Sequence, residues 1–204
     1  MEAEQRAPAL VRNAVRKLFH RHAPVLFRHV SSFHLSEDRK LLEAVILPYF
    51  ASDSSVERVL FVGCEWYTKL YERLFRSKEY WTLEIDPEKR RYGARRHVVD
   101  ALKHLRQHAA AGYFDAVICN GVFMKTAIET REEAEPSFEA CRECLRAGGW
   151  LVLGWNDTDE LRPYPPTESA ALAKFEQSVF PPLGVSEYAT QTSYRHTYTF
   201  YRKS

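Results

Sequence analysis

The chain has 204 residues, of which 45% are hydrophobic and 27% charged, and its formal net charge is +2. These values are typical of an ordinary globular protein and exclude a disordered or low-complexity chain. So small a net charge does not indicate binding to nucleic acid or a membrane surface, and no apolar stretch approaches the roughly 18 residues of a membrane span. The first residues are basic but lack the apolar core of a signal peptide, so we expect a cytoplasmic protein without nucleic-acid or membrane partners.

The first 50 residues predict helices. Apolar residues recur at helical spacing over 8–34, with basic residues between them and a break near Pro24. Ser36 is a suitable N-cap for a further helix over 37–49. We expect residues 1–50 to form a helical cap and residues 51–204 to form the main domain.

From residue 57 onward, short apolar runs alternate with helical patterns. The expected strands are 59–62, 80–85, 96–99, 114–119 and 150–155, and the expected helices are 67–75, 101–110 and 132–145. Near-continuous apolar strands alternating with helices indicate a parallel sheet covered on both faces. After a further expected helix over 172–180, strands at 184–192 and 196–202 follow each other directly, which predicts an antiparallel edge strand.

Four cysteines are present, and two of them form a C-x-x-C pair. Cys141 and Cys144 lie in a helical pattern, and no second C-x-x-C or H-x-x-H completes a metal set. Cys64 and Cys119 lie in apolar runs, where cysteine behaves as a small hydrophobic residue. We therefore expect reduced thiols and no metal site.

In open parallel sheets, ligands bind at the carboxyl ends of the strands. Gly63 follows the first expected strand and permits a tight turn with close approach of a ligand to the backbone. Glu84 lies 21 residues later, a spacing at which a carboxylate can accept hydrogen bonds from ribose hydroxyls. Further polar residues follow the other strands: Asp86, Asp100, Asn120, Asn156 and Asp157.

The turn after Gly63 lacks the glycine pattern of a dinucleotide-binding loop. Glu65, Trp66 and Tyr67 crowd it, and Glu65 would repel a phosphate. This argues against an NAD-dependent oxidoreductase and favours a ligand with an adenosine and a cationic end.

With these features in place, residues 57–203 resemble the class I S-adenosylmethionine-dependent methyltransferases. The motifs that carry the resemblance are VLFVGCEWYT, TLEIDP, HVVDAL, YFDAVICNGVF, LRAGGWLVLGWN and HTYTFYRK. The resemblance implies a Rossmann-like α/β fold with a seven-stranded, mostly parallel sheet, an antiparallel last strand and helices on both faces. It also implies S-adenosylmethionine as cofactor.

The resemblance assigns roles to the residues at the strand ends. Gly63 would face the methionine and ribose parts of the cofactor, and Glu84, or alternatively Asp86, would bind the ribose hydroxyls. Asp100 would accept a hydrogen bond from the adenine amino group, with a backbone contact from Ala101. Asn120, after the fourth strand, would lie near the sulfonium.

The methionine end departs from the family pattern. An acidic residue usually stands two positions before the first glycine, and here that residue is Phe61. We hypothesise that Glu65 replaces it and holds the α-ammonium group, while Trp66 or Tyr67 contacts the sulfonium through a cation–π interaction. The alternative is that Glu65 only caps the following helix.

Methyl transfer requires alignment and desolvation, with a general base only where the acceptor is protonated. The candidate catalytic residues are Asn120, Asn156 and His196, and we expect a small-molecule acceptor. Two alternatives stay open at this point. One is a cyclase or lyase that consumes the same cofactor and releases methylthioadenosine, and the other is a non-catalytic binding module on the same fold.

Overall fold

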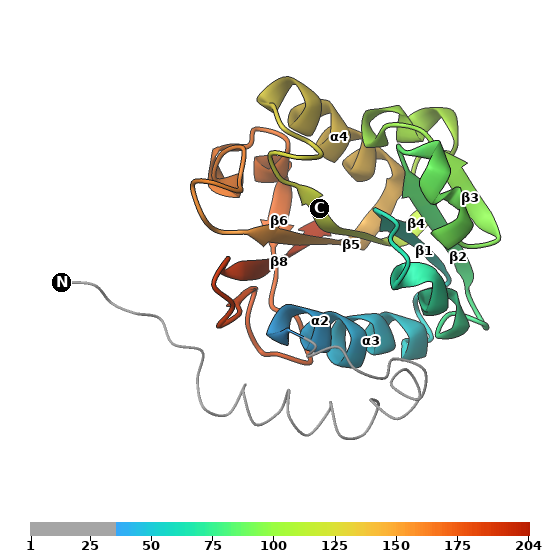
Figure 1. Cartoon of the computed structure of the whole chain (residues 1–204). Helices are drawn as coiled ribbons and strands as arrows, with labels where there is room; N and C mark the ends of the chain where they lie inside the picture. Colours follow the sequence, from blue (N-terminus) through green and yellow to red (C-terminus); the bar gives the residue numbers. More distant parts are fainter. Residues whose placement is uncertain (1–35) are drawn as a thin grey trace.

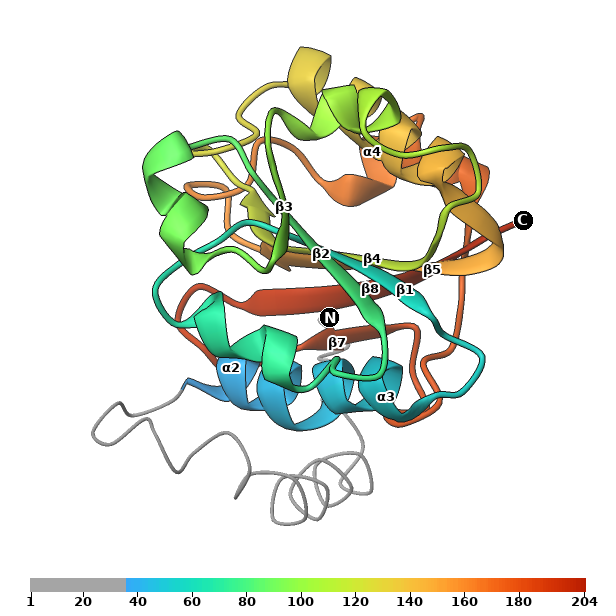
Figure 2. The same ribbon diagram turned by 90° about the vertical axis from the view of Figure 1, so that its right-hand side faces the viewer.

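The computed structural model describes residues 36–204, and the helices expected over 8–34 lie outside this range (Figures 1 and 2). The described part begins with a continuous helical stretch after Ser36. It consists of α2 (Glu37–Leu41), a π-helical turn (Leu42–Ile46) and α3 (Leu47–Ser52), and it ends three residues beyond the helix expected from the sequence. The proposed boundary between a cap and a main domain stays a prediction.

A single mixed sheet forms the centre of the molecule. Its strands are β1 (Arg58–Val62), β2 (Glu79–Glu84), β3 (Arg96–Val99), β4 (Phe114–Phe123), β5 (Leu145–Asn156), β6 (Phe175–Gln177), β7 (Glu187–Ala189) and β8 (His196–Lys203). The spatial order is β3-β2-β1-β4-β5-β8-β6, with β7 also paired to β8. The pairs among β1 to β5 are parallel, whereas β8 runs antiparallel to β5, β6 and β7. The predicted α/β sheet with an antiparallel last strand is confirmed.

Two short strands share the outer edge of β8. β6 pairs with residues 201–203 of β8, and β7 pairs with residues 197–199. Together they take the place of one interrupted strand, which reconciles eight observed strands with the seven expected. The helix expected over 172–180 is wrong, because only a 3₁₀ turn (Leu172–Lys174) precedes β6. The prolines at 181 and 182 stop a helix there, and the edge of β8 offers the backbone of β6 hydrogen-bond partners.

Helices cover both faces of the sheet (Figure 1). Along β1, Leu60 and Val62 pack into the core under α4 (Arg131–Cys144), and the alternate residues Val59 and Phe61 pack toward α2 and α3. This alternation is the period-2 pattern of a strand buried on both faces. The helices expected over 67–75 and 101–110 are shorter than predicted, each being a six-residue 3₁₀ helix, Thr68–Arg73 and Leu102–Gln107.

The cysteine pair of the C-x-x-C motif lies in α4, and Cys141 and Cys144 are both buried free thiols. Burial raises the pKa of Cys144 to about 11, which keeps this thiol protonated and unreactive at neutral pH. Within residues 36–204, no cluster of histidine, cysteine and carboxylate side chains is arranged to hold a metal ion. In the same range, no helix combines the length and apolar character needed to cross a membrane.

Candidate functional site

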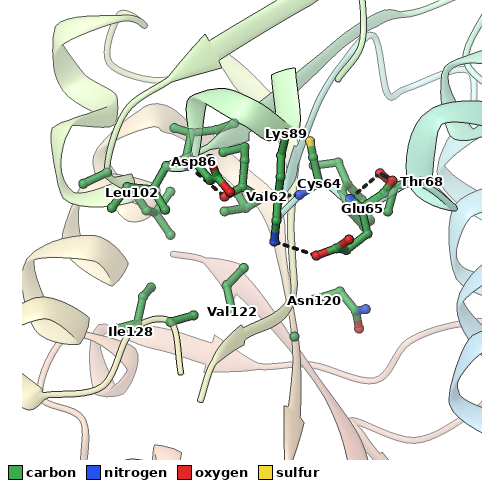
Figure 3. Close-up of a pocket in the computed structure, with 18 of the residues that line it drawn as sticks. Val62, Cys64, Glu65, Thr68, Asp86, Lys89, Leu102, Asn120, Val122 and Ile128 are labelled. Atoms are coloured by element: carbon green, nitrogen blue, oxygen red, sulfur yellow. Dashed lines mark hydrogen bonds and ion pairs between the residues drawn. The ribbon is translucent and has the colours of Figure 1, made fainter. Parts of the chain in front are cut away.

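A cavity of about 500 Å³ opens at the carboxyl ends of the central strands (Figure 3). Most of the residues singled out from the sequence line it: Gly63, Glu65, Tyr67, Glu84, Asp86, Asp100, Ala101 and Asn120. Trp66, Asn156 and His196 are not among the lining residues. The volume lies within the range of about 300–1,000 Å³ that is usual for small-molecule and cofactor sites.

Gly63 lets the backbone turn tightly at the end of β1. Its φ of +90° lies in a region that residues with a side chain rarely adopt. A Cβ at this position would lie 2.8 Å from Cγ1 of Val122, which also lines the cavity. Any larger residue would therefore collide with Val122 and displace this part of the cavity wall.

Glu84 is the last residue of β2, and its carboxylate fastens two turns to each other. One oxygen accepts a hydrogen bond from the backbone N–H of Cys64 at 2.7 Å, and the other accepts from the N–H of Asp86 at 3.0 Å. Each carboxylate oxygen can accept a further hydrogen bond. Glu84 is only 8% exposed but lines the cavity, so it offers a ligand two fixed acceptors. The carboxylate of Asp86, by contrast, caps the next turn by accepting from the N–H of Glu88.

Glu65 forms an ion pair with a residue that the sequence analysis did not single out. Nζ of Lys89 lies 2.5 Å from Oε1 of Glu65, and Figure 3 shows the lysine reaching across from the 3₁₀ helix Pro87–Tyr92. Both side chains are about one-third exposed and both line the cavity. The pair raises the pKa of Lys89, so the ammonium group stays charged. Glu65 thus binds the ammonium group of Lys89, whereas the sequence predicted that it would bind the α-ammonium group of the cofactor.

The two aromatic residues after Glu65 lie differently. Trp66 is 49% exposed, whereas Tyr67 is half-buried in the cavity wall. The guanidinium of Arg39, from α2, lies 3.6 Å from the centre of the Tyr67 ring. One face of this ring therefore already carries a cation–π contact from the protein itself.

Asp100 follows β3, and its carboxylate is held by three donors. Oδ1 accepts from the N–H of Ala101 at 2.7 Å and lies 2.8 Å from Nδ1 of His104, while Oδ2 lies 2.8 Å from Nε2 of His108. The hydrogen bonds from His108 and His104 lower the pKa of Asp100 to about 2. An ionised acceptor therefore stands at this wall of the cavity at any physiological pH.

The three candidate catalytic residues meet at one point. Nδ1 of His196 lies 2.7 Å from Oδ1 of Asn156, and its Nε2 lies 3.1 Å from Oδ1 of Asn120. Asn120 alone reaches the cavity, and His196 is buried behind it at 4% exposure. Gly154 of β5 makes this contact possible, since a Cβ there would lie 2.2 Å from Oδ1 of Asn120.

Burial lowers the pKa of His196 to about 4, so the imidazole is neutral at pH 7. A neutral imidazole donates from one nitrogen only, so one of its two amide neighbours must present an NH₂ group to the ring. The shorter contact assigns the donated proton to Asn156. A hydrogen bond between Nε2 and Asn120 then requires the amide of Asn120 to be rotated so that its NH₂ group, in place of Oδ1, faces the ring, and in that orientation the carbonyl oxygen can accept a hydrogen bond from the cavity.

No family model matches the chain, and no curated protein matches its sequence. Solved structures do match: a TehB-like SAM-dependent methyltransferase from Corynebacterium glutamicum is 16% identical, with a TM-score of 0.58 over 97% of this chain and 100% of that one.

Two further matches are named for their reactions. The N-methyltransferase NodS from Bradyrhizobium japonicum, in complex with S-adenosylhomocysteine, is 14% identical, with a TM-score of 0.57 over 88% of this chain and 97% of that one. A 1,6-didemethyltoxoflavin-N1-methyltransferase from Burkholderia thailandensis is 15% identical, with a TM-score of 0.53 over 100% of this chain and 93% of that one. The chain has the fold of a class I S-adenosylmethionine-dependent methyltransferase.

On this methyltransferase fold, α2 and the π-helical turn after it supply side chains that the sequence pattern did not indicate. Glu43, only 5% exposed, accepts a hydrogen bond from the hydroxyl of Tyr71 at 2.7 Å and forms an ion pair with Arg39 at 2.6 Å. Asp38 accepts from the hydroxyl of Tyr194 at 3.1 Å. A charged residue within an apolar helical stretch was the available signal for Glu43. Its partners, distant in sequence, were not predictable.

Proposed function

We propose that the chain is an S-adenosylmethionine-dependent methyltransferase that acts on a small-molecule acceptor. The observation that carries the proposal is the carboxylate of Glu84, which is fixed by two backbone N–H groups at the end of β2 and lines the cavity. A preorganised carboxylate beside a glycine turn is suited to two vicinal ribose hydroxyls.

The rest of the cavity fits the same cofactor. Asp100 and Ala101 would hold the adenine, and Glu65 would take the α-ammonium group after exchange with Lys89. The carboxylates also suit a sulfonium cation electrostatically. When bound, S-adenosylmethionine supplies an electrophilic methyl group, and no metal is needed for the displacement.

The side of the cavity that carries Asn120 would position the acceptor. The carbonyl oxygen of Asn120 would accept a hydrogen bond from an N–H or O–H group and so direct a lone pair of the acceptor atom toward the methyl group. His196 and Asn156 would hold Asn120 in place rather than touch the acceptor. His196 is neutral and buried, so an acceptor that is already a neutral nucleophile suits the site better than one that needs a strong base.

The named neighbours support a small acceptor. One binds 1,6-didemethyltoxoflavin, a small molecule, and another is an N-methyltransferase, although both are remote in sequence. The volume of the cavity, about 500 Å³, also lies within the size range of small-molecule sites.

Thermal unfolding with candidate ligands tests the cofactor. S-adenosylmethionine and S-adenosylhomocysteine should raise the melting temperature, and NAD should not. A ligand at 100 times its dissociation constant adds about 2.7 kcal/mol to the free energy of unfolding. The Glu84→Gln variant should lose the shift and the Glu88→Gln variant, altered at an exposed neighbouring carboxylate, should keep it.

Product analysis tests the reaction. The protein is incubated with S-adenosylmethionine and pooled small amines, phenols and thiols, and the products are identified by mass spectrometry. S-adenosylhomocysteine with a methylated acceptor is the expected result. Methylthioadenosine would instead show cyclisation or lysis of the cofactor, and binding without any turnover would indicate a non-catalytic module.

A further inference from the structure

A second hollow lies at the other end of the strands from the cofactor cavity. It has a volume of about 730 Å³ and is built by the end of the 3₁₀ helix Thr68–Arg73, the following turn and the first residues of β2 and β3. Because β2 and β3 are parallel, their first residues lie together at the amino ends of the strands, opposite to the carboxyl ends at which the cavity opens. The hollow is therefore separate from the proposed active site.

The lining of this hollow is strongly basic. It contains six cationic side chains: Lys69, Arg73, Arg76, Lys78, Arg95 and Arg96. Only two acidic residues line it, Glu72 and Glu79, and both are engaged. Glu72 accepts a hydrogen bond from the backbone N–H of Arg95, and Glu79 accepts hydrogen bonds from the side chains of Trp81 and Tyr113. The net charge of +2 for the whole chain conceals this local excess.

Four of the six cations are available to a ligand. Lys69, Arg73, Arg76 and Arg95 are exposed, and within the part of the chain that the structure describes their side chains form no ion pair or hydrogen bond. Four like charges around one concave surface repel one another, and this repulsion would be smaller if the same residues were spread over the protein surface. A cluster of cations without anionic partners is expected where an anion with several oxygens binds.

The shape and lining of the hollow select the kind of anion. Its aromatic residues, Phe75 and Tyr80, are buried and stacked on each other, with ring centres 4.7 Å apart, so neither can stack on a base. No exposed apolar side chain lines it that would insert into a lipid bilayer. The hollow can therefore recognise an anion mainly through its arginine side chains, whose guanidinium groups match the geometry of phosphate groups.

We propose that this basic hollow, formed by the six cationic residues named above, docks the phosphate backbone of a nucleic acid without reading its sequence. Phosphate contacts position a strand and carry no sequence information, in keeping with the absence of accessible rings in the lining. The proposal stands apart from the cofactor and the reaction, because the hollow shares no lining residue with the cavity.

Fluorescence anisotropy with a labelled 20-nucleotide RNA of mixed sequence tests the proposal. The variant is Arg73→Glu/Arg76→Glu, and the matched control is Lys125→Glu/Lys174→Glu, which changes the net charge equally at exposed positions elsewhere. The hollow variant should bind at least tenfold more weakly, and the control should stay within about twofold of the unaltered protein. For the hollow variant, the plot of the logarithm of the binding constant against the logarithm of the salt concentration should lose roughly 1.4 units of slope. Each phosphate contact to a single strand contributes about 0.7, and two are removed.

Several outcomes would overturn the proposal. Equal weakening of RNA binding in both variants would mean that the whole protein attracts RNA by its charge. If the unaltered protein does not bind the RNA at low salt, about 50 mM, the hollow is not a nucleic-acid site. Binding to vesicles of anionic lipid in preference to the RNA would indicate a membrane surface instead. The Lys69→Glu/Arg95→Glu variant repeats the test at other positions if the first does not fold. Unchanged melting-temperature shifts with S-adenosylhomocysteine in every variant would separate this result from the fate of the proposed function.

Discussion

The two sides of the cofactor cavity differ in charge. Beside β1 to β3, the wall carries the carboxylates of Glu65, Glu84 and Asp100, two of them held by backbone N–H groups or histidines. Beside β4, the amide of Asn120 faces the cavity, and Asn156 and the neutral imidazole of His196 lie behind it without lining the cavity. The acidic side is suited to a cationic cofactor with hydroxyl and amino groups. The neutral side is suited to placing an acceptor without ionising it.

The largest effect should come from the acidic side. In the Glu84→Gln variant, ribose hydroxyls lose a charged acceptor, and hydrogen bonds to charged groups contribute about 1.5–3 kcal/mol each. Binding of S-adenosylhomocysteine should weaken at least about 100-fold by calorimetry. The Glu88→Gln control should bind normally. If Glu84→Gln also binds normally, the ribose lies elsewhere and the comparison of the two sides fails.

The neutral side predicts a dependence of stability on pH. The pKa of His196 is lowered from 6.5 to about 4 in the folded state, so the unfolded chain binds a proton between these values and the folded protein does not. Stability should therefore fall as the pH is lowered from about 6.5 to 4, by up to about 3 kcal/mol from this residue. Chemical denaturation at each pH measures the loss.

The His196→Gln variant isolates this contribution, because the other histidines remain. The fall in its free energy of unfolding between pH 6.5 and 4 should be smaller than that of the unaltered protein. An identical fall in both proteins would show that His196 is protonated in the folded state, and the wall would then not be neutral.

Gly154→Ala should impair the neutral side and spare the acidic side. The new Cβ would overlap Oδ1 of Asn120 and press on His196, so the amide must move. We expect kcat to fall about tenfold, which corresponds to about 1.4 kcal/mol. The dissociation constant for S-adenosylhomocysteine should change by less than about twofold. A loss of binding equal to the loss of kcat would show that the two sides do not act separately.

The smallest effect should come from Lys89. Its ion pair with Glu65 is partly exposed, and such pairs contribute roughly 0–1 kcal/mol. The Lys89→Met variant frees Glu65 and should bind S-adenosylmethionine a few-fold more tightly, whereas Glu65→Ala should bind it more weakly. Calorimetry at low and high salt measures both. Weaker binding in Lys89→Met would mean that the lysine, rather than Glu65, contacts the cofactor.

The periodicity of the sequence was sufficient to predict the sheet, because β1 and the central residues of β4 and β5 are buried on both faces and therefore mostly apolar. The strand ends then indicated Gly63 and Glu84 as cavity residues. The helix expected over 172–180 failed because its apolar residues serve a short edge strand, whose pairing with β8 is a tertiary effect.

Other features could not be predicted because they depend on residues distant in sequence. Lys89 meets Glu65 only when the turn after β2 approaches the turn after β1. Gly154 has no local requirement for glycine, since its constraint comes from the side chains of Asn120 and His196 across the sheet. The basic hollow likewise assembles from two strands and a turn, so net charge concealed it.

The divided outer edge of β8 has a consequence for self-association. Unpaired strand edges are templates on which a second molecule can add a strand, and long flat edges invite aggregation. Here β6 and β7 are only three residues each, and the chain between them folds back through a bridge between Phe180 and Val185. No continuous ladder is left on that side of the described sheet, so the interruption protects the protein from polymerising through this edge.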